Sequence, residues 1–312
     1  MRPADPSSAG KPALVPALLV VYFVWGSTYL AIRYAIETLP GFTMAAVRFA
    51  IAGLILYLWG RSRGGARPTL RQLAASAGIG ALLLLVGNGG VVWAEYRINS
   101  GVAALLIASE PVWVAVLTPL VLRRRGGIGW RTIAGLSLGV LGVAILVVDP
   151  RGLDPTRVDP VGATVILLSS FGWALGSLWS VRAELPPSRE VSTGTQMLCG
   201  SALLAAAGAA RGEWATVEPA AFSPRSVLAL GYLIVFGSIV AFTAYNYLLR
   251  SAPPGLVATY AFVNPVVAVL LGWMLVDEPL GWRVGGAALP ILGALALIFG
   301  DHGRGAKRTA EA

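Results

Sequence analysis

Two ionisable residues, Glu110 and Arg48, lie inside long apolar stretches of this sequence. A charge placed away from water is energetically unfavourable, so each of these residues is a candidate for function. The two side chains could pair with each other, or one could face a water-filled cavity, where Glu110 would exchange protons. The competing interpretation is a buried pair or hydrogen-bonded group that only orders the helices. We favour that structural role for Arg48 and weigh the two roles equally for Glu110.

Aromatic and amide side chains share helix faces within the same apolar stretches. Tyr260 and Asn264 are four positions apart, as are Trp25 and Tyr29, so each pair lies on one face of a helix. Such a wall suits an amphipathic ligand. Hydrogen bonding between helices is the better explanation for any single residue, but the occurrence of such residues in both halves of the chain favours a shared cavity. The cavity candidates are Trp25, Tyr29, Asn88, Glu110, Trp173, Asn246, Tyr260 and Asn264.

Two prolines, Pro111 and Pro265, fall inside apolar stretches and are candidate helix breaks. Each removes a backbone donor and leaves the carbonyl four residues earlier, at Ile107 or Ala261, without its helical partner. In lipid, that carbonyl must find another donor or face a cavity that contains water. The prolines could act as flexible points during a conformational change, and a static kink that only shapes packing is an equal alternative.

Several kinds of chemistry are disfavoured by what the sequence lacks. A single cysteine, Cys199, and a single histidine, His302, provide neither an intramolecular disulfide nor a histidine-based metal cluster. The glycine patterns occur inside apolar helices, without the strand and turn of a nucleotide-binding loop. We therefore expect no catalytic residues, no metal ion and no cofactor.

The composition indicates that lipid is the main solvent of this chain. Of 312 residues, 56% are hydrophobic and only 12% are charged, which is about half the charged share of a soluble domain. The mean hydropathy is +0.72. The net charge of +9 does not indicate nucleic-acid binding, because the arginines fall in short segments between apolar runs. The sequence predicts an all-α integral membrane protein with the lipid bilayer as its partner.

Ten apolar runs approach the length of about 20 residues that crosses a bilayer. The first run is expected to remain as a helix rather than to be cleaved as a signal peptide. Five runs lie in residues 13–148 and five in 160–300, and residues 1–12 and 301–312 form tails. The expected spans are 13–36, 41–60, 72–95, 100–122, 128–148, 160–182, 191–210, 226–249, 255–276 and 281–300.

An even number of spans puts both ends of the chain on one side of the membrane, and the basic residues indicate which side. With a cytoplasmic N-terminus, 16 Lys and Arg residues lie in or beside cytoplasmic segments and 7 lie in the opposite segments, which leaves Arg48 inside a span. Basic residues favour the cytoplasmic side. The sequence therefore predicts a multi-pass protein of the cytoplasmic membrane with both termini, and both tails, in the cytoplasm.

The two sets of five runs are related in sequence. Gly101–Ala104 and Glu110–Val112 in the fourth run match Gly255–Ala258 and Asn264–Val266 in the ninth. Because five is an odd number, a second copy enters the membrane from the opposite side, which gives two inverted five-helix repeats. In proteins built this way, substrates commonly bind near the midplane, where the repeats meet. A Gly-Trp-Arg step also opens the last run of each half, at Gly129–Arg131 and Gly281–Arg283.

Four short motifs in this sequence are also typical of one family: Trp25–Tyr29, Arg48–Phe49, Pro265–Leu270 and Glu278–Leu280. Through them the sequence resembles, over nearly its whole length, the drug/metabolite transporter superfamily, in particular its bacterial EamA-domain members. The resemblance implies an EamA-type arrangement of ten helices, cytoplasmic termini, a central cavity and export of amino acids or similar metabolites. One departure is that the first half has Arg123–Gly126 near the place where the second half keeps Asp277 and Glu278.

The expected function is secondary transport or facilitated diffusion of a small metabolite by alternating access, with protons as a candidate coupling ion. The sequence has no ATP-binding motif, so energy would come from a gradient. A non-transporting scaffold or sensor is one alternative, and it would be expected to keep a dry, apolar interior. A membrane-embedded enzyme is disfavoured because Glu110 is an isolated acid, and a passive channel is a nearer alternative. The sequence leaves the oligomeric state open.

Overall fold

The computed structural model describes residues 13–123, 130–147, 158–252, 254–277, 279 and 281–310, and these are helical with short connections. Helices occupy each expected apolar run, at bounds close to the expected ones. The helices up to residue 147 are α1 (Leu14–Val20), η1 (Val21–Trp25), α2 (Gly26–Ala35), α3 (Gly41–Ser62), α4 (Leu70–Gly80), η2 (Ala81–Gly89), α5 (Gly90–Ala94), α6 (Ser100–Ile107), α7 (Glu110–Val121) and α8 (Trp130–Val147).

The helices after residue 157 follow the same succession. They are α9 (Pro160–Arg182), α10 (Arg189–Ala210), η3 (Glu213–Thr216), η4 (Pro219–Ala221), α11 (Pro224–Tyr232), η5 (Leu233–Val240), α12 (Ala241–Ser251), α13 (Pro254–Val257), α14 (Tyr260–Val276) and α15 (Trp282–Ala310). The expected tail 1–12, residues 124–126 and Glu278 lie outside the described residues.

Six helical segments of the described chain are long and apolar enough to cross a membrane. Several of them join consecutive elements, such as α1 to α2 in Leu14–Ala35 and α11 to α12 in Pro224–Ser251. The others are Gly41–Ser62, Leu70–Ala94, Ser100–Val121 and Pro160–Arg182, and Val263–Val276 is a shorter apolar helix. Length and composition therefore identify a multi-pass membrane protein.

Two of the helical rods are interrupted near the prolines that the sequence singled out. Between α6 and α7 the helix breaks at Ala108 and Ser109, immediately before Glu110 and Pro111. The hydroxyl of Ser170 donates to the Ile107 carbonyl at 3.5 Å, so a side chain of α9 approaches the group that Pro111 leaves without a helical partner. Pro265 lies inside α14, which continues through it, and the break on that side precedes Tyr260.

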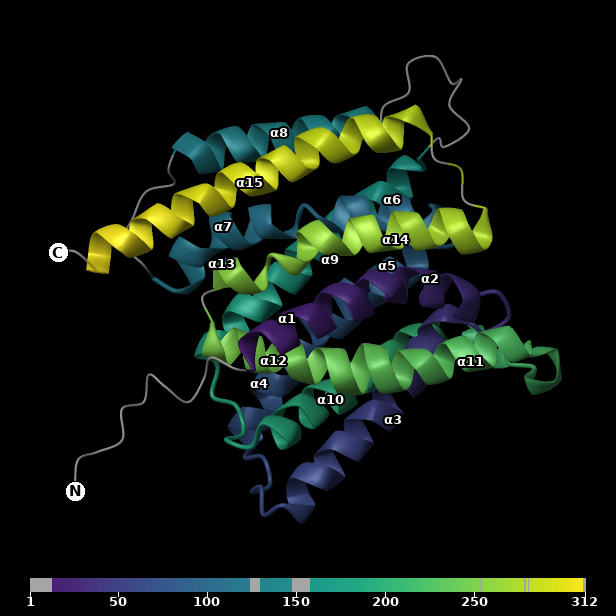
Figure 1. The fold of residues 1–312 in the computed structure, drawn as a ribbon. Coiled ribbons are helices and arrows are strands. Elements are labelled where there is room, and N and C mark those ends of the chain that lie inside the picture. The colour runs from purple at the N-terminus through teal and green to yellow at the C-terminus, as the bar shows by residue number, and fades with distance from the viewer. Residues whose placement is uncertain are drawn as a thin grey trace, which may run out of the picture.

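Helices from the two halves of the chain pack side by side. The second run of each half forms one pair, α3 with α10, and the fifth run forms another, α8 with α15 (Figure 1). The contacts of α14 with α2 and of α7 with α9 also join the halves. Between α3 and α10 the backbones meet at Gly53 and Gly194, because a Cβ atom on Gly194 would lie 2.7 Å from the Gly53 carbonyl oxygen. The core is thus shared between the two halves.

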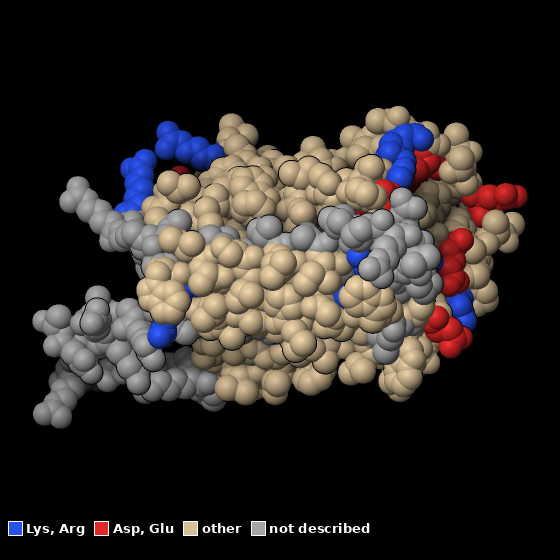
Figure 2. Space-filling model, turned by 90° about the horizontal axis from the view of Figure 1, so that it is seen from above, with Lys and Arg blue, Asp and Glu red and all other residues tan. Residues whose placement is uncertain are grey.

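Charged side chains gather at the two ends of the bundle, and an uncharged belt lies between them on the face shown in Figure 2. The basic end, where α1 begins and α15 ends (Figure 1), carries Arg61, Arg63, Arg67, Arg71, Arg123, Arg182, Arg189 and Arg250. The acidic end carries Glu37, Asp159, Glu213, Glu218 and Asp277, and it has fewer arginines than the basic end. A belt of this kind is what the hydrocarbon layer requires.

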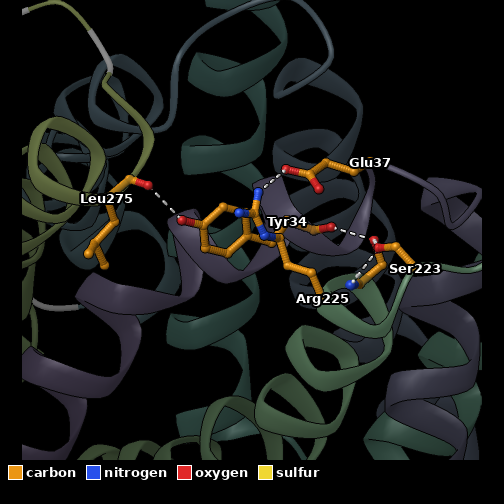
Figure 3. A network of polar contacts seen from close by, with 6 residues as sticks. Tyr34, Glu37, Ser223, Arg225 and Leu275 are labelled. Carbon is orange, nitrogen blue, oxygen red and sulfur yellow. Dashed lines mark hydrogen bonds and ion pairs between the residues drawn. The ribbon is translucent and has the colours of Figure 1, made fainter.

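At the acidic end, Tyr34 links three helices. Its hydroxyl donates to the Leu275 carbonyl at the end of α14 (3.0 Å), and its own carbonyl accepts from Ser226 of α11 (2.7 Å). The Arg225 guanidinium lies 4.7 Å from the centroid of the Tyr34 ring and forms an ion pair of 3.4 Å with Glu37. Figure 3 shows Tyr34 between Leu275 on one side and Arg225 on the other. This network ties α2 to α11 and α14.

Two further polar contacts fix helix ends. At the basic end, Arg182 of α9 donates to the Val121 carbonyl at the end of α7 (2.7 Å). At the acidic end, Asp159 caps α9 by accepting from the Val161 amide and pairs with Arg97 at 2.9 Å. The Arg97 guanidinium, followed by the Val161 amide, holds the pKa of the Asp159 carboxyl below its usual range.

Candidate functional site: a central cavity between the halves

A cavity lies between the two halves and holds about 620 Å³ of empty space, counting the part open to the outside. Ile32 in the last turn of α2 and Arg48 in the second turn of α3 both line it, which places it toward the acidic end. Its walls are Trp25, Thr28, Tyr29, Ile32, Arg48, Phe49, Gly87, Asn88, Val91, Ile107, Glu110, Ser169, Ser170, Trp173, Gly237, Phe242, Tyr260 and Asn264. They come from helices of both halves.

Aromatic rings form one side of the cavity. Trp25 lies edge-on to Trp173, with ring centroids 5.4 Å apart, and edge-on to Tyr260, with centroids 5.2 Å apart. Phe242 and Tyr245 complete the cluster, and Tyr245 lies 4.8 Å from Trp25 by ring centroids. The Trp25 indole also donates to the Gly237 carbonyl at 3.1 Å, which fixes its orientation. The cluster therefore presents rigid apolar faces with satisfied polar edges.

Glu110 is buried at the break between α6 and α7 and accepts a hydrogen bond from the Tyr260 hydroxyl of α14. Asn264, one helical turn after Tyr260, also lines the cavity. With its amide nitrogen turned toward them, Asn264 donates to the carbonyls of Tyr22 (2.9 Å) and Tyr260 (3.1 Å). The acid and the amide thus combine two roles, because both line the cavity and both hold helices together.

Arg48 lies elsewhere on the cavity wall and does not pair with Glu110. Its Nε donates to the hydroxyl of Ser238 at 2.7 Å, and its guanidinium lies 4.6 Å from the centroid of the Phe49 ring. Within the described residues, no carboxylate comes within ion-pair distance of Arg48, and its buried Nη1 has no hydrogen-bond partner. The pair that the sequence allowed between Arg48 and Glu110 is therefore not formed.

A hydrogen-bonded layer closes the cavity toward the basic end. The hydroxyls of Tyr245 and Ser177 lie 2.6 Å apart, and the Trp173 indole donates to Tyr245 at 3.1 Å. Beyond this layer is a smaller pocket of about 270 Å³, again counting open space, whose walls include Val181 and Pro254 near the basic ends of their helices. Glu110 lines both the cavity and this pocket. It is therefore the acid that lies between the two spaces.

Most of the residues that the sequence proposed for a cavity are brought together here. Trp25, Tyr29, Asn88, Glu110, Trp173, Tyr260 and Asn264 all line it. Asn246 does not, because its amide donates to Thr193 of α10 at 2.9 Å and bridges two helices instead. Asn88 has a buried side-chain oxygen without a partner among the described residues. Pro111 and Pro265 are outside the lining set.

Tyr245, Phe242 and Ser170 belong to this region and were not among the residues that the sequence singled out. A sequence signal existed for part of it, since Trp173 and Ser177 are four apart on α9 and share the face that meets Tyr245. No comparable signal distinguishes Tyr245 from the other aromatic residues of these spans. In the described part of the chain, no group of three or more Asp, Glu, Cys and His residues is arranged to hold a metal ion.

Comparison with known proteins shows which family the chain resembles. The model of the EamA-like transporter family matches residues 13–148 and 160–300. The chain is 40% identical over 268 residues to YedA, an uncharacterized inner membrane transporter of Escherichia coli (strain K12), and the match covers 86% of this chain and 84% of that protein. It is 26% identical to a WAT1-related chloroplastic protein of Arabidopsis thaliana, over 90% of this chain and 68% of that protein.

A solved crystal structure has a similar fold. It superimposes with a TM-score of 0.61 over 92% of this chain and 95% of its own chain, at 20% sequence identity. At that identity the match concerns the arrangement of helices.

Proposed function

The chain belongs to the EamA-like transporter family, and we propose on this basis that it is a secondary transporter or facilitator that works by alternating access. The observation that carries the proposal is the cavity between the halves, whose walls combine an aromatic cluster with Arg48 and Glu110. A scaffold or sensor would be expected to have a dry, apolar centre, and charged cavity walls favour a transporter instead.

We further propose that the two halves are inverted five-helix repeats that together form ten transmembrane helices. Three pairs of positions at one common spacing of 154 residues have matching features in the structure, which supports this relation. The pairs are 110 and 264, 121 and 275, and 123 and 277. Glu110 and Asn264 line the same cavity. Arg123 and Asp277, which follow α7 and α14, both have a positive φ, of 49° and 51°. The two residues have opposite charges but the same left-handed backbone conformation after equivalent helices.

The second of these pairs also supports opposite orientations of the two halves. The Val121 carbonyl accepts from Arg182 at the basic end, and the Leu275 carbonyl accepts from Tyr34 at the acidic end. The same contact between a helix end and the first span of the other half thus occurs at opposite faces of the molecule, as an inverted repeat requires.

The substrate class that fits best is an amino acid or a similar small amphipathic metabolite moving outward. Aromatic faces such as those of Trp25 and Trp173 suit an apolar group, whereas Arg48 and Glu110 suit charged or polar groups. The positive-inside rule applied to the basic end makes that end, and both termini, cytoplasmic. On this topology the cavity lies nearer the outer face of the membrane than the cytoplasmic face.

Flux measurements in liposomes test the proposal. Purified protein is reconstituted and assayed by counterflow with a panel of labelled amino acids, other organic acids, amines and sugars, at equal and at opposed pH. The expected result is saturable uptake of at least one amphipathic compound. Flux that rises linearly with concentration would indicate a channel, and absence of flux across the whole panel contradicts the proposal.

Glu110→Gln tests the further proposal that Glu110 carries a coupled proton. The amide keeps the shape of the side chain but cannot exchange a proton, so the response of flux to an imposed pH gradient should disappear while counterflow at equal pH persists. Glu95→Gln is the matched control, because Glu95 is also buried but does not line the cavity. An unchanged pH response in Glu110→Gln excludes Glu110 as the proton carrier.

A further inference from the structure

Arg48 is a buried cation on the wall of a cavity, and only part of its guanidinium is engaged. The residue is 3% exposed, Nε is bound to Ser238, and one face of the group lies on Phe49. Nη1 is buried and has no partner among the described residues, and no acid pairs with it there. A buried, unpartnered charge destabilises a protein unless something completes its hydrogen bonds.

From these contacts, and resting on the proposed transport function, we propose that Arg48 binds a carboxylate group of the transported molecule. A guanidinium offers planar donors that match the two oxygens of a carboxylate, and hydrogen bonds of this kind are strong because both partners are charged. Ser238 and Phe49 hold the group in one orientation. Nη1 is the donor that such a ligand would complete.

The charges of the cavity favour a carboxylate over a phosphate. Among the residues that line it, Arg48 is the cation and Glu110 is the acid, so the walls together are close to neutral when both are ionised. A doubly charged phosphate would leave an uncompensated negative charge in a poorly hydrated space. A molecule with one carboxylate on Arg48 leaves a smaller excess than a phosphate does. If the molecule also carries an ammonium group, as an amino acid does, that excess disappears, and on the same cavity wall Asn88 has an acceptor oxygen without a partner among the described residues.

A purely structural role for Arg48 makes different predictions. In that role the guanidinium would serve to tie α3 to η5 through Ser238, and removing Ser238 would be as harmful as removing Arg48. In the binding role, Ser238→Ala leaves the charge and Nη1 in place, so carboxylate recognition should persist. Arg48→Met should also raise the thermal stability of the ligand-free protein in the binding role, because it removes an unpartnered buried charge.

Ligand binding to the purified full-length protein in detergent tests the proposal without requiring transport. The probes are phenylalanine and leucine, their carboxamides, and the phosphonate analogue of phenylalanine, measured by thermal stabilisation and by calorimetry. At least one of the two carboxylates should bind, and its carboxamide should bind about 10- to 100-fold more weakly, the range expected for one charged hydrogen bond. Arg48→Met should abolish that difference, Arg48→Lys should keep part of it, and Ser238→Ala should keep most of it.

Several outcomes overturn the proposal: equal binding of a carboxylate and its carboxamide by the unmodified protein, no binding of either carboxylate, preference for the phosphonate, or equal losses in Ser238→Ala and Arg48→Met. The comparison of carboxylate with carboxamide needs no variant, so misfolding of Arg48→Met does not prevent a decision. Failure here is distinct from failure of the transport proposal. Liposome flux of a compound without a carboxylate supports transport alone, whereas Arg48-dependent binding without flux supports this site alone.

Discussion

Asn88 and Asn246 are the same residue type in comparable spans, yet they lie in different surroundings. Asn88 lines the cavity and has a buried oxygen without a partner in the described structure, whereas Asn246 donates to Thr193 between helices. The two residues therefore form a matched pair for testing whether water reaches the cavity. Asn88 lies six residues before the end of the apolar segment Leu70–Ala94, and Asn246 lies five residues before the end of Pro224–Ser251, so the two are at similar depths from opposite ends of the bundle.

We expect a cysteine at position 88 to react with a small, water-soluble thiol reagent faster than a cysteine at position 246. The experiment uses Asn88→Cys and Asn246→Cys in a Cys199→Ser background, because Cys199 is the single native cysteine. Mass spectrometry of the protein in membrane vesicles gives the two rates. Equal rates, or protection of both positions in every condition, contradict a cavity that is accessible to solvent.

The sequence identified much of this site because charge and amide groups are unusual in apolar runs. Glu110, Arg48 and Asn88 could be found for that reason. Tyr245 could not, since aromatic residues are common in such runs. It belongs to the cluster only because its side chain points toward Trp25 and Trp173. Asn246 was proposed for the same reason as Asn88, as an amide in an apolar run, and its residue type does not reveal that its partner is Thr193 of a neighbouring helix.

At the scale of elements, α3 and α10 form a close contact between the halves. A Cβ atom on Gly194 would lie 2.6 Å from the Tyr57 amide nitrogen and 2.7 Å from the Gly53 carbonyl oxygen, and both neighbours are backbone atoms that cannot rotate away. Small residues of this kind let membrane helices approach closely and pack by van der Waals contact.

We expect Gly194→Ala to lower the free energy of unfolding by about 1–3 kcal/mol, the usual range for an overpacked contact. Gly231→Ala in α11 is the control, because a Cβ atom there meets nothing within 4 Å. That variant should be neutral, or more stable by up to about 1 kcal/mol from helix propensity. Thermal unfolding in detergent followed by circular dichroism compares the two. A neutral Gly194→Ala would show that the helices can separate without loss.

The interruptions within the helical rods were harder to predict than the rods themselves. Pro111 indicated a break, and the helix is interrupted at Ala108 and Ser109, just before Glu110 and Pro111. Pro265 gave the same signal, yet α14 continues through it and the break lies before Tyr260. A proline removes one backbone hydrogen bond, but neighbouring helices decide whether the chain bends there or elsewhere.

At the scale of the whole molecule, the separation of basic and acidic ends predicts the orientation in the membrane. We expect both termini to be cytoplasmic, because the basic end contains the start of α1 and the end of α15 (Figures 1 and 2). A C-terminal green fluorescent protein fusion should therefore fluoresce, and a C-terminal alkaline phosphatase fusion should be inactive. Phosphatase inserted between η3 and η4, at the acidic end, should be active. The reverse pattern contradicts the topology.

The class of fold was readable from the sequence because the bilayer imposes a length and a composition on every span. The described helices occur at bounds near the expected ones, for example Pro160–Arg182 for 160–182. Which helices contact one another was not readable. The pairing of α3 with α10 depends on small residues such as Gly53 meeting Gly194, and glycine is frequent throughout this chain, with 38 residues.

The packing of α3 against α10 has a consequence for biosynthesis. The first residue of α3, Gly41, precedes the first residue of α10, Arg189, by 148 positions. At roughly 5–20 residues per second, the ribosome delivers α10 roughly 7 to 30 s after α3. During that interval α3 lies in lipid without α10, and the face of α3 that carries Gly53 is exposed to lipid. Packing of α3 against α10 therefore follows the insertion of α3 into the membrane. A translational pause between the halves would lengthen the time that α3 spends without its partner helix.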